Sequence, residues 1–127
     1  MDSLDLISKK NNDRISIKIN EKKWCELFFI QNEKKQLLGC NNIKRVIKPL
    51  AIAFLPSKSR KTQLFAGKNL FEILYLSEPH SMLLGEEDNN SLKLYQVDSK
   101  GELHYLLFLD EETKLSWLTN VFESFIK

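Results

Sequence analysis

The chain has 127 residues, of which 43% are hydrophobic and 28% charged, with a formal net charge of +2. This length is typical of one domain that needs no metal or disulfide to hold its core, and the composition is that of a globular protein. Apolar runs such as Leu103–Leu109 are too short to span a bilayer, and the polar start of the chain does not resemble a signal peptide. With only two cysteines, we expect a cytoplasmic location.

The charges are unevenly distributed along the chain. Up to Lys68, fifteen lysines and arginines stand against six acidic residues, a net charge of +9. From Asn69 onward, four lysines stand against eleven acidic residues, a net charge of −7. If the two halves occupy different parts of the domain, the resulting dipole would orient it against an anionic surface. The alternative is that both halves are simply solvated exteriors.

Alternating apolar residues predict strands in the first half of the chain. Arg14–Asn20 (RISIKIN) has a period of two, and the aromatic-rich Lys23–Gln31 is its expected hairpin partner. After a polar turn, Gln36–Cys40 returns as a third strand. Leu50–Leu55 is read as a fourth strand, because Pro49 and Pro56 bracket it and proline favours strand ends.

The position of the first strand is open. Leu4–Lys9 could pair in place of Arg14–Asn20, which would move Lys9 and Lys10 toward the candidate site. Otherwise residues 1–13 are an N-terminal tail, and residues 14–127 form the single domain.

Cys25 and Cys40 are expected to be reduced core residues. If Gln31 faces Gln36 across the turn, Leu27 faces Cys40, and Cys25 is its diagonal neighbour. Diagonal neighbours are about 7–8 Å apart, which is too far for an easy disulfide.

The second half of the chain predicts three more strands. Ser57–Thr62 is a basic loop, and Asn69–Ser77 is the fifth strand. Glu78–Asn90, with its proline, glycine and acidic residues, is read as an irregular insert. Leu92–Val97 and Glu102–Leu109 are the sixth and seventh strands, joined by a turn with glycine in the left-handed position.

The last segment changes to a helical period. Asp110 is the expected N-cap, and Glu111 and Glu112 complement the helix dipole. Apolar residues then recur at spacings of three and four and give the helix a wide apolar face that can cover a sheet. They are Leu115, Trp117, Leu118, Val121, Phe122, Phe125 and Ile126.

Residues for catalysis are sparse. His80 and His104 are the only histidines, and neither they nor the two cysteines have the spacing of a zinc site. The four glycines are isolated, so no phosphate-binding loop is predicted. We therefore expect no enzyme activity, no metal and no cofactor, with His104 as a structural residue of its strand.

Two stretches resemble the pleckstrin homology domain. Phe108–Ile126 (FLDEETKLSWLTNVFESFI) places Trp117 in the middle of the last helix, where that family has a signature tryptophan. Aromatic and aliphatic residues match the second strand of the family, at Trp24, Phe28, Phe29 and Ile30. The resemblance implies a mainly β (α+β) fold, a seven-stranded antiparallel barrel of two packed sheets capped by one C-terminal amphipathic helix.

The resemblance also implies where a lipid would bind. Members that bind phosphoinositides carry basic residues at the positions of Cys25 and Leu27, which cannot bind phosphate, so the usual head-group pocket is not expected here. Other basic residues flank the first hairpin or lie on the loop after the fourth strand, and these loops share the open end of such a barrel. The candidate lipid- and anion-binding residues are Lys18, Lys22, Lys23, Lys58, Arg60 and Lys61. Each basic residue near an anionic leaflet contributes about 1 kcal/mol; the alternative is a solvated rim of loops.

Two hypotheses for function follow. The first is a non-catalytic module that recruits a larger signalling or scaffold protein to the inner face of a membrane containing anionic phospholipids or phosphoinositides. The second is a protein–protein interaction module without significant lipid binding, with Met82–Leu84 as a candidate apolar anchor. Binding to nucleic acid is not favoured, because the aromatic residues of the first half are needed by the core.

Overall fold

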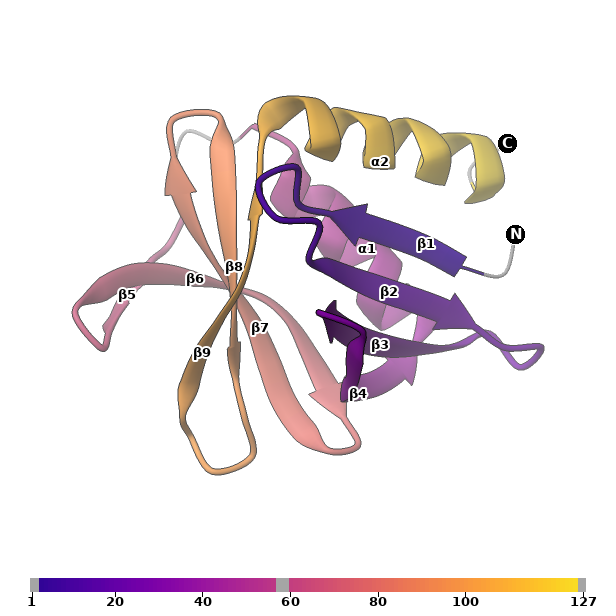
Figure 1. Ribbon diagram of the computed structural model, residues 1–127, viewed down its shortest axis with the longest axis horizontal. Coiled ribbons are helices and arrows are strands. Elements are labelled where there is room, and N and C mark those ends of the chain that lie inside the picture. Colours follow the sequence, from indigo (N-terminus) through magenta and orange to yellow (C-terminus); the bar gives the residue numbers. More distant parts are fainter. Residues whose placement is uncertain (1–2, 57–59, 126–127) are drawn as a thin grey trace.

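The computed structural model describes residues 3–56 and 60–125, which form nine strands and two helices (Figure 1). The first sheet contains β1 (Ser3–Ile7), β2 (Arg14–Ile19), β3 (Trp24–Gln31) and β4 (Lys34–Asn42), and α1 (Ile43–Phe54) follows it. The second sheet contains β5 (Gln63–Phe65), β6 (Lys68–Ser77), β7 (His80–Asp88), β8 (Ser91–Val97) and β9 (Leu103–Leu109), and α2 (Glu111–Phe125) follows it.

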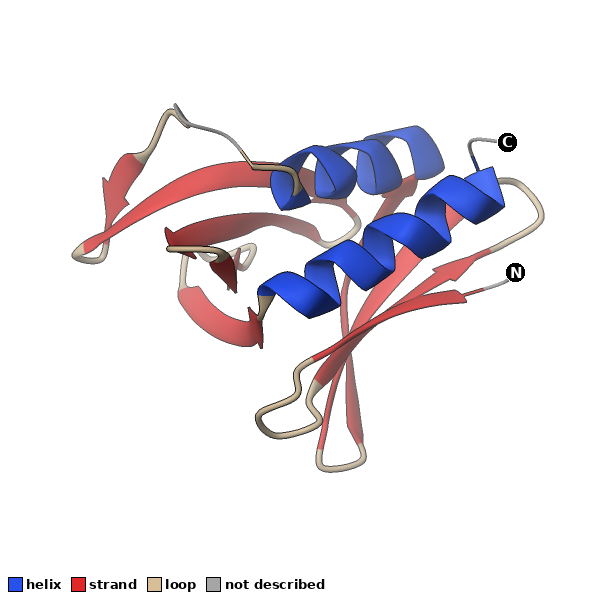
Figure 2. Ribbon diagram, turned by 90° about the horizontal axis from the view of Figure 1, so that it is seen from above, coloured by secondary structure: helices blue, strands red, loops and turns tan. Residues whose placement is uncertain are grey.

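The fold is mainly β with a C-terminal helix, as predicted. The expected seven-stranded barrel is wrong, because the described strands form two antiparallel sheets of four and five strands that do not close into a barrel. Within each sheet the strands lie in chain order. Figure 2 shows α1 and α2 side by side across one side of the molecule, with the strands beneath them.

Both candidates for the first strand are strands. β1 and β2 pair in antiparallel register, with Leu4 opposite Ile17 and Leu6 opposite Ile15. All four of these side chains are at most 3% exposed. Much of the predicted N-terminal tail therefore belongs to the first sheet, because both segments alternate and each buries its apolar face.

The predicted fourth strand is wrong, since Leu50–Leu55 lies mostly in α1. The core-facing residues of α1 recur at helical spacing, namely Val46, Ile47, Leu50, Ala53 and Phe54. Asn42 is the N-cap, and its side chain accepts a hydrogen bond of 2.9 Å from the Lys44 N–H. Pro49 lies inside the helix, although proline has no N–H to donate to the helical hydrogen bonds. Burial of the apolar face of α1 outweighs the low helix propensity of this residue.

Two strands of the second sheet were not predicted. The segment read as an irregular insert contains β7, which pairs with β6 on one side and β8 on the other. Its acidic residues and Gly85 suggested a loop, but Leu83 and Leu84 alternate between the two faces of the sheet. β5 is a three-residue strand, which is too short for a periodic signal.

The β3–β4 hairpin is tighter than predicted. Asn32 and Glu33 form a two-residue turn, both at positive φ, so Gln31 pairs with Lys34 and not with Gln36. A bulge between Leu27 and Phe28 then shifts the register of the ladder.

The tighter turn and the bulge together place Cys40 opposite Glu26 instead of Leu27, and Cys25 opposite Asn41. Both cysteines are buried and free. Burial raises the pKa of the Cys25 thiol to about 11, which keeps it protonated near neutral pH.

The two sheets and two helices enclose one main core. The expected N-cap of α2 is confirmed, because the Asp110 carboxylate accepts a 2.7 Å hydrogen bond from the Thr113 N–H. Trp117 of α2 is 3% exposed and meets Phe54 of α1 edge-on, with ring centroids 5.0 Å apart. Neither of the described helices has both the length and the hydropathy needed to cross a membrane.

Candidate functional site: an apolar groove and a lysine face

The predicted basic residues fall into two groups that the fold does not bring together. One group belongs to β2 and the β2–β3 turn, and the other precedes β5, at the opposite end of the molecule (Figure 1). The first group is Lys18, Lys22 and Lys23, and the second is Arg60 and Lys61. Lys58 lies outside the described residues. The expectation that both loops share one open end is therefore not met.

Arg60 is bound within the fold. One of its Nη atoms donates to the carbonyls of Ala53 and Leu55, at 2.9 and 2.6 Å, at the C-terminal end of α1. Its Nε atom lies 2.7 Å from a Glu87 carboxylate oxygen, and its guanidinium stacks over the Phe71 ring at 4.6 Å. Its charge is already matched by Glu87 and the helix dipole, so Arg60 is not a free ligand for a phosphate.

Lys9 and Lys10, the basic residues of the alternative first strand, also have partners. The Lys9 ammonium lies 2.9 Å from Glu112, which together with Asp110 raises the pKa of Lys9. The Lys10 ammonium lies 4.0 Å from the centroid of the Phe108 ring. Both contacts fasten the β1–β2 turn to the start of α2 and the end of β9.

A hollow of about 700 Å³, which we call the groove, lies on the second sheet. Its apolar wall comes from four strands and includes Phe65, Leu70, Met82, Leu84 and Val97. Its volume lies within the usual range of ligand pockets.

The floor of the groove is the face of the sheet turned away from the main core. Met82 pairs with Val97 and Leu84 with Tyr95, so these side chains share one face, opposite to that of the core residue Leu83. Together with Leu70 they form a second, smaller apolar cluster. Burial and the hydrogen bond to Glu86 raise the pKa of Tyr95 to about 12, so its hydroxyl remains a donor.

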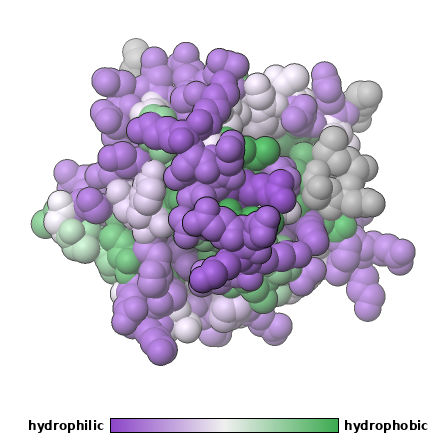
Figure 3. All heavy atoms as spheres, in the orientation of Figure 1, coloured by the Kyte–Doolittle hydropathy of each residue, from purple (hydrophilic) through white to green (hydrophobic). Residues whose placement is uncertain are grey.

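One wall of the groove is an arm formed by β5 and the start of β6. Ala66 and Gly67 make its two-residue turn, and Phe65 pairs with Lys68. Leu64 is 74% exposed and Phe65 36% exposed. Figure 3 shows apolar residues at the surface of this arm, on the left of the view.

A smaller hollow of about 240 Å³, the side hollow, lies between α1 and β6. It shares Arg60, Phe71 and Glu72 with the groove, so the two hollows flank the same part of β6. Its α1 wall contains Lys44 and Lys48.

The charge around the two hollows is mostly positive. Lys44, Lys48 and Lys61 stand against one carboxylate, Glu72, once Arg60 is paired with Glu87. Within residues 3–56 and 60–125, none of these three lysines is in an ion pair. An anionic group entering here would gain favourable electrostatic interactions without displacing an existing partner.

A second basic feature, the lysine face, lies on the first sheet. The ammonium groups of Lys18 and Lys35 lie 5.5 and 4.2 Å from the centroid of the Phe28 ring. The neighbouring Lys18 ammonium, which carries the same charge, lowers the pKa of Lys35. Exposed Leu37 is paired with Phe28 across the β3–β4 ladder, which adds apolar surface.

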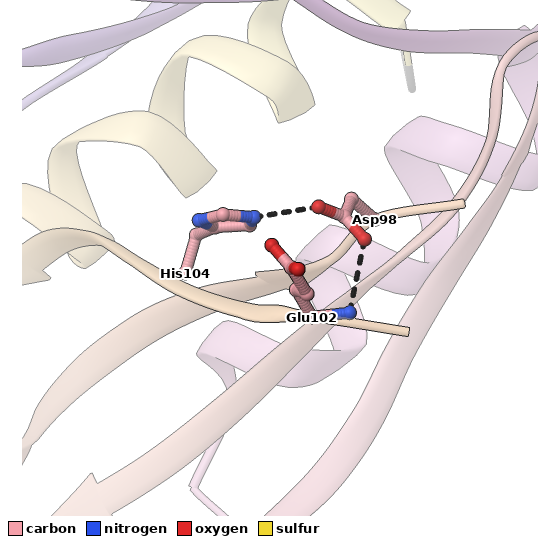
Figure 4. A group of neighbouring side chains, drawn as sticks. All are labelled: Asp98, Glu102 and His104. Atoms are coloured by element: carbon pink, nitrogen blue, oxygen red, sulfur yellow. Dashed lines mark hydrogen bonds and ion pairs between the residues drawn. The ribbon is translucent and has the colours of Figure 1, made fainter. Parts of the chain in front are cut away.

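Asp98, Glu102 and His104 meet at the β8–β9 turn (Figure 4). One Asp98 oxygen accepts from the backbone N–H groups of Lys100 and Glu102, each at 2.9 Å, and the other lies 2.7 Å from the His104 Nε2. These contacts lower the pKa of Asp98, and the hydrogen bond with His104 has the largest effect. The three side chains are close enough to share a cation. The hydrogen bonds of Asp98 to His104 and to the two backbone N–H groups brace the hairpin turn without one.

Comparison of the chain with protein-family models, with curated proteins and with solved structures found no match in any of the three. The resemblance to pleckstrin homology domains therefore rests on the residues quoted above. Trp117 is buried as that resemblance expects, but it contacts α1, a helix that the expected order of elements does not contain.

Sequence reasoning identified Arg60 and Lys61 but missed the groove beside them. The signal that could have found β5 is the Ala66-Gly67 pair between Gln63–Phe65 and the next strand, a weak form of a hairpin turn. The sequence does not link Lys35 to Lys18, because their contact depends on the register of three strands.

Proposed function

We propose that this chain is a non-catalytic binding module whose groove takes an acidic, apolar segment of a partner protein. The observation that carries this proposal is the open groove of about 700 Å³, with an apolar wall, Lys61 in its lining, and Lys44 and Lys48 in the adjoining side hollow. Exposed apolar surface rimmed by charged residues is typical of protein–protein interaction sites.

The polarity of the partner follows from the charges around the groove and the side hollow. Taken over both hollows, three lysines against one carboxylate favour a segment with net negative charge, and repel a basic one. The apolar wall favours aliphatic or aromatic anchors, since binding energy concentrates in a few buried apolar side chains.

A display library of random linear 12-residue peptides, selected on the intact chain, tests this proposal. We expect enrichment of peptides that combine acidic and apolar residues. Their affinity should fall at least tenfold in the groove variants Phe65→Ser and Lys61→Glu. Matched changes away from the groove, Leu115→Ser and Lys34→Glu, should leave the affinity unchanged. No enrichment, or binding that ignores both groove variants, would overturn the proposal.

The second candidate is peripheral binding to anionic membrane, as the pleckstrin resemblance implies. It is supported by the lysine face, where Lys18 and Lys35 gather beside the aromatic ring of Phe28. Lys22 and Lys23 lie on the neighbouring turn, and several basic residues together would hold the chain weakly at an anionic leaflet.

Sedimentation with liposomes of graded anionic content, with and without phosphoinositides and at low and near-physiological salt, tests the second candidate. Charge reversal at Lys18 and Lys35 should abolish binding, while reversal at Lys61 should not. Binding that requires phosphoinositide and survives physiological salt would support a specific lipid module. No binding at low salt would exclude this candidate.

A further inference from the structure

The free edge of β5 suggests how a partner segment binds. Among the described strands, β5 pairs with β6 alone, and all three of its residues are exposed. Sheet edges with unpaired N–H and C=O groups are templates for another strand, and natural proteins usually protect them with charges, proline or a covering element. Here the edge instead carries Leu64, which is 74% exposed.

The register identifies which backbone groups are free. The two-residue turn at Ala66-Gly67 makes Phe65 and Lys68 the hydrogen-bonded closing pair of the hairpin. The next pair, Leu64 with Asn69, is then a non-hydrogen-bonded pair, so the N–H and C=O of Leu64 point away from β6. They lie on the outer edge of the arm, ready to pair with another strand.

The same strand turns its side chains toward the groove. Gln63 and Phe65 alternate with Leu64 and line the groove, and Lys61 lines it too, two residues before Gln63. A strand added beside β5 would continue this alternation. Every second side chain would face the groove, and the others would pack near Leu64 on the opposite face of the arm.

We propose that the partner segment binds as an added β-strand on the edge of β5, with alternate apolar side chains facing the groove and an acidic side chain near Lys61. This inference rests on the function proposed above and specifies the conformation and pattern of the ligand. Backbone hydrogen bonds supply affinity in this mode, and alternate side chains supply specificity. β5 spans about 10 Å at the rise of a strand, so four to six residues of the partner suffice.

The peptides selected on the groove provide the probe. Leu64→Pro removes the outward N–H but no hydrogen bond of the β5–β6 ladder, and Leu64→Ala is the matched control that keeps the N–H. We expect Leu64→Pro to weaken binding about tenfold, from the loss of one or two backbone hydrogen bonds, with Leu64→Ala close to the parent. Thermal unfolding of each variant checks that the arm is intact.

Amide hydrogen exchange gives a second readout. The Leu64 amide should exchange rapidly in the free chain and become protected when the peptide binds. If binding depends on Phe65 and Lys61 but not on Leu64→Pro, and the Leu64 amide stays unprotected, the added strand is wrong while the proposed function stands. If no peptide depends on the groove variants, both are wrong.

Discussion

Arg60 stabilises the fold at a point where three elements meet. Its side chain contacts the C-terminal carbonyls of α1, Glu87 of β7 and the ring of Phe71 on β6. The Arg60 side chain is only 12% exposed. Its removal would leave the Glu87 carboxylate, which is 35% exposed, without its cation.

We therefore expect Arg60→Ala to lower the free energy of unfolding by about 2–4 kcal/mol. Arg60→Lys should recover only part of this, because an ammonium cannot reproduce the fork that meets several acceptors at once. Urea denaturation measures both variants, with Lys61→Ala as a neighbouring control that changes stability little. Equal stability of Arg60→Ala and the parent would contradict the role assigned here.

Ala66 holds a backbone conformation that suits other residues better. Its φ is 51°, and the turn it forms with Gly67 favours asparagine at this position. Ala66→Asn should stabilise the chain by about 1 kcal/mol, and Ala66→Val should destabilise it, because a β-branched residue tolerates this region least. Thermal unfolding would detect both shifts, and shifts of the same sign would count against the turn as described.

The Asp98 carboxylate makes stability depend on acid pH. Its pKa is lowered in the fold by His104 and by two backbone N–H groups, so its stabilising contribution is present above the ordinary carboxyl pKa, near 4. The contribution is lost as the pH falls through the lowered value. Asp98→Asn should therefore flatten the loss of stability below about pH 4, measured by urea denaturation from pH 7 to pH 2. Parallel curves for the two proteins would refute this.

At the scale of elements, the two sheets approach each other closely where β4 passes β6. A Cβ atom on Gly39 would lie 2.7 Å from the Leu76 Cβ, and its φ is 149°. Gly67, in the turn of the arm, also has positive φ, at 79°, but has open space around it. The two glycines therefore separate the cost of a clash from the cost of the backbone conformation.

Gly67→Ala should cost about 1–2 kcal/mol for its conformation alone. Gly39→Ala should cost at least about 2 kcal/mol more, because the β-carbon of Leu76 cannot move without moving the strand. Chemical denaturation of the two variants gives the difference. A smaller loss for Gly39→Ala than for Gly67→Ala would show that the sheets are not in contact there.

Elements were predictable from the sequence where one face is buried and the period is clear. β2, β3, β8, β9 and α2 fall near their predicted bounds because each alternates, or repeats, over six or more residues. α1 was mistaken for a strand because its last residues alternate in size and Pro49 stands inside it. Its helical period appears only when Val46 and Ile47 are counted with them. The groove was not predictable, because its shape depends on where the three-residue strand β5 lies relative to β6, β7 and β8.

At the scale of the whole molecule, α1 and α2 contact each other through Phe54 and Trp117. α1 follows the first sheet and α2 follows the second, so this contact joins the two halves of the chain. A double-mutant cycle with Phe54→Leu and Trp117→Leu should give a coupling energy of about 0.5–1.5 kcal/mol. If the losses of unfolding free energy in the two single variants add up to that of the double variant, the two rings have no specific interaction.

The basic first half and the acidic second half of the sequence are not fully separated in the fold. The acidic second half supplies Glu112 to Lys9 and Glu87 to Arg60, so opposite charges of the two halves meet at contacts between them. The lysine face and the rim of the groove keep positive charge at two separate places. Within residues 3–56 and 60–125, the lysine face and the surroundings of the groove are therefore two separate basic regions.

The order of the strands also bears on how the chain folds. Every described ladder joins strands that follow one another in the sequence, through seven hairpin connections. Such pairing keeps sequence separations short, and proteins rich in short-range contacts fold faster than β-proteins whose strands pair across the whole chain. The first sheet and α1 are complete by Phe54, so a growing polypeptide can assemble them before the second sheet has been synthesised. The arm at β5 is then the first part of the second sheet to appear, and its outer edge, which carries Leu64, stays unpaired even after β6 has followed.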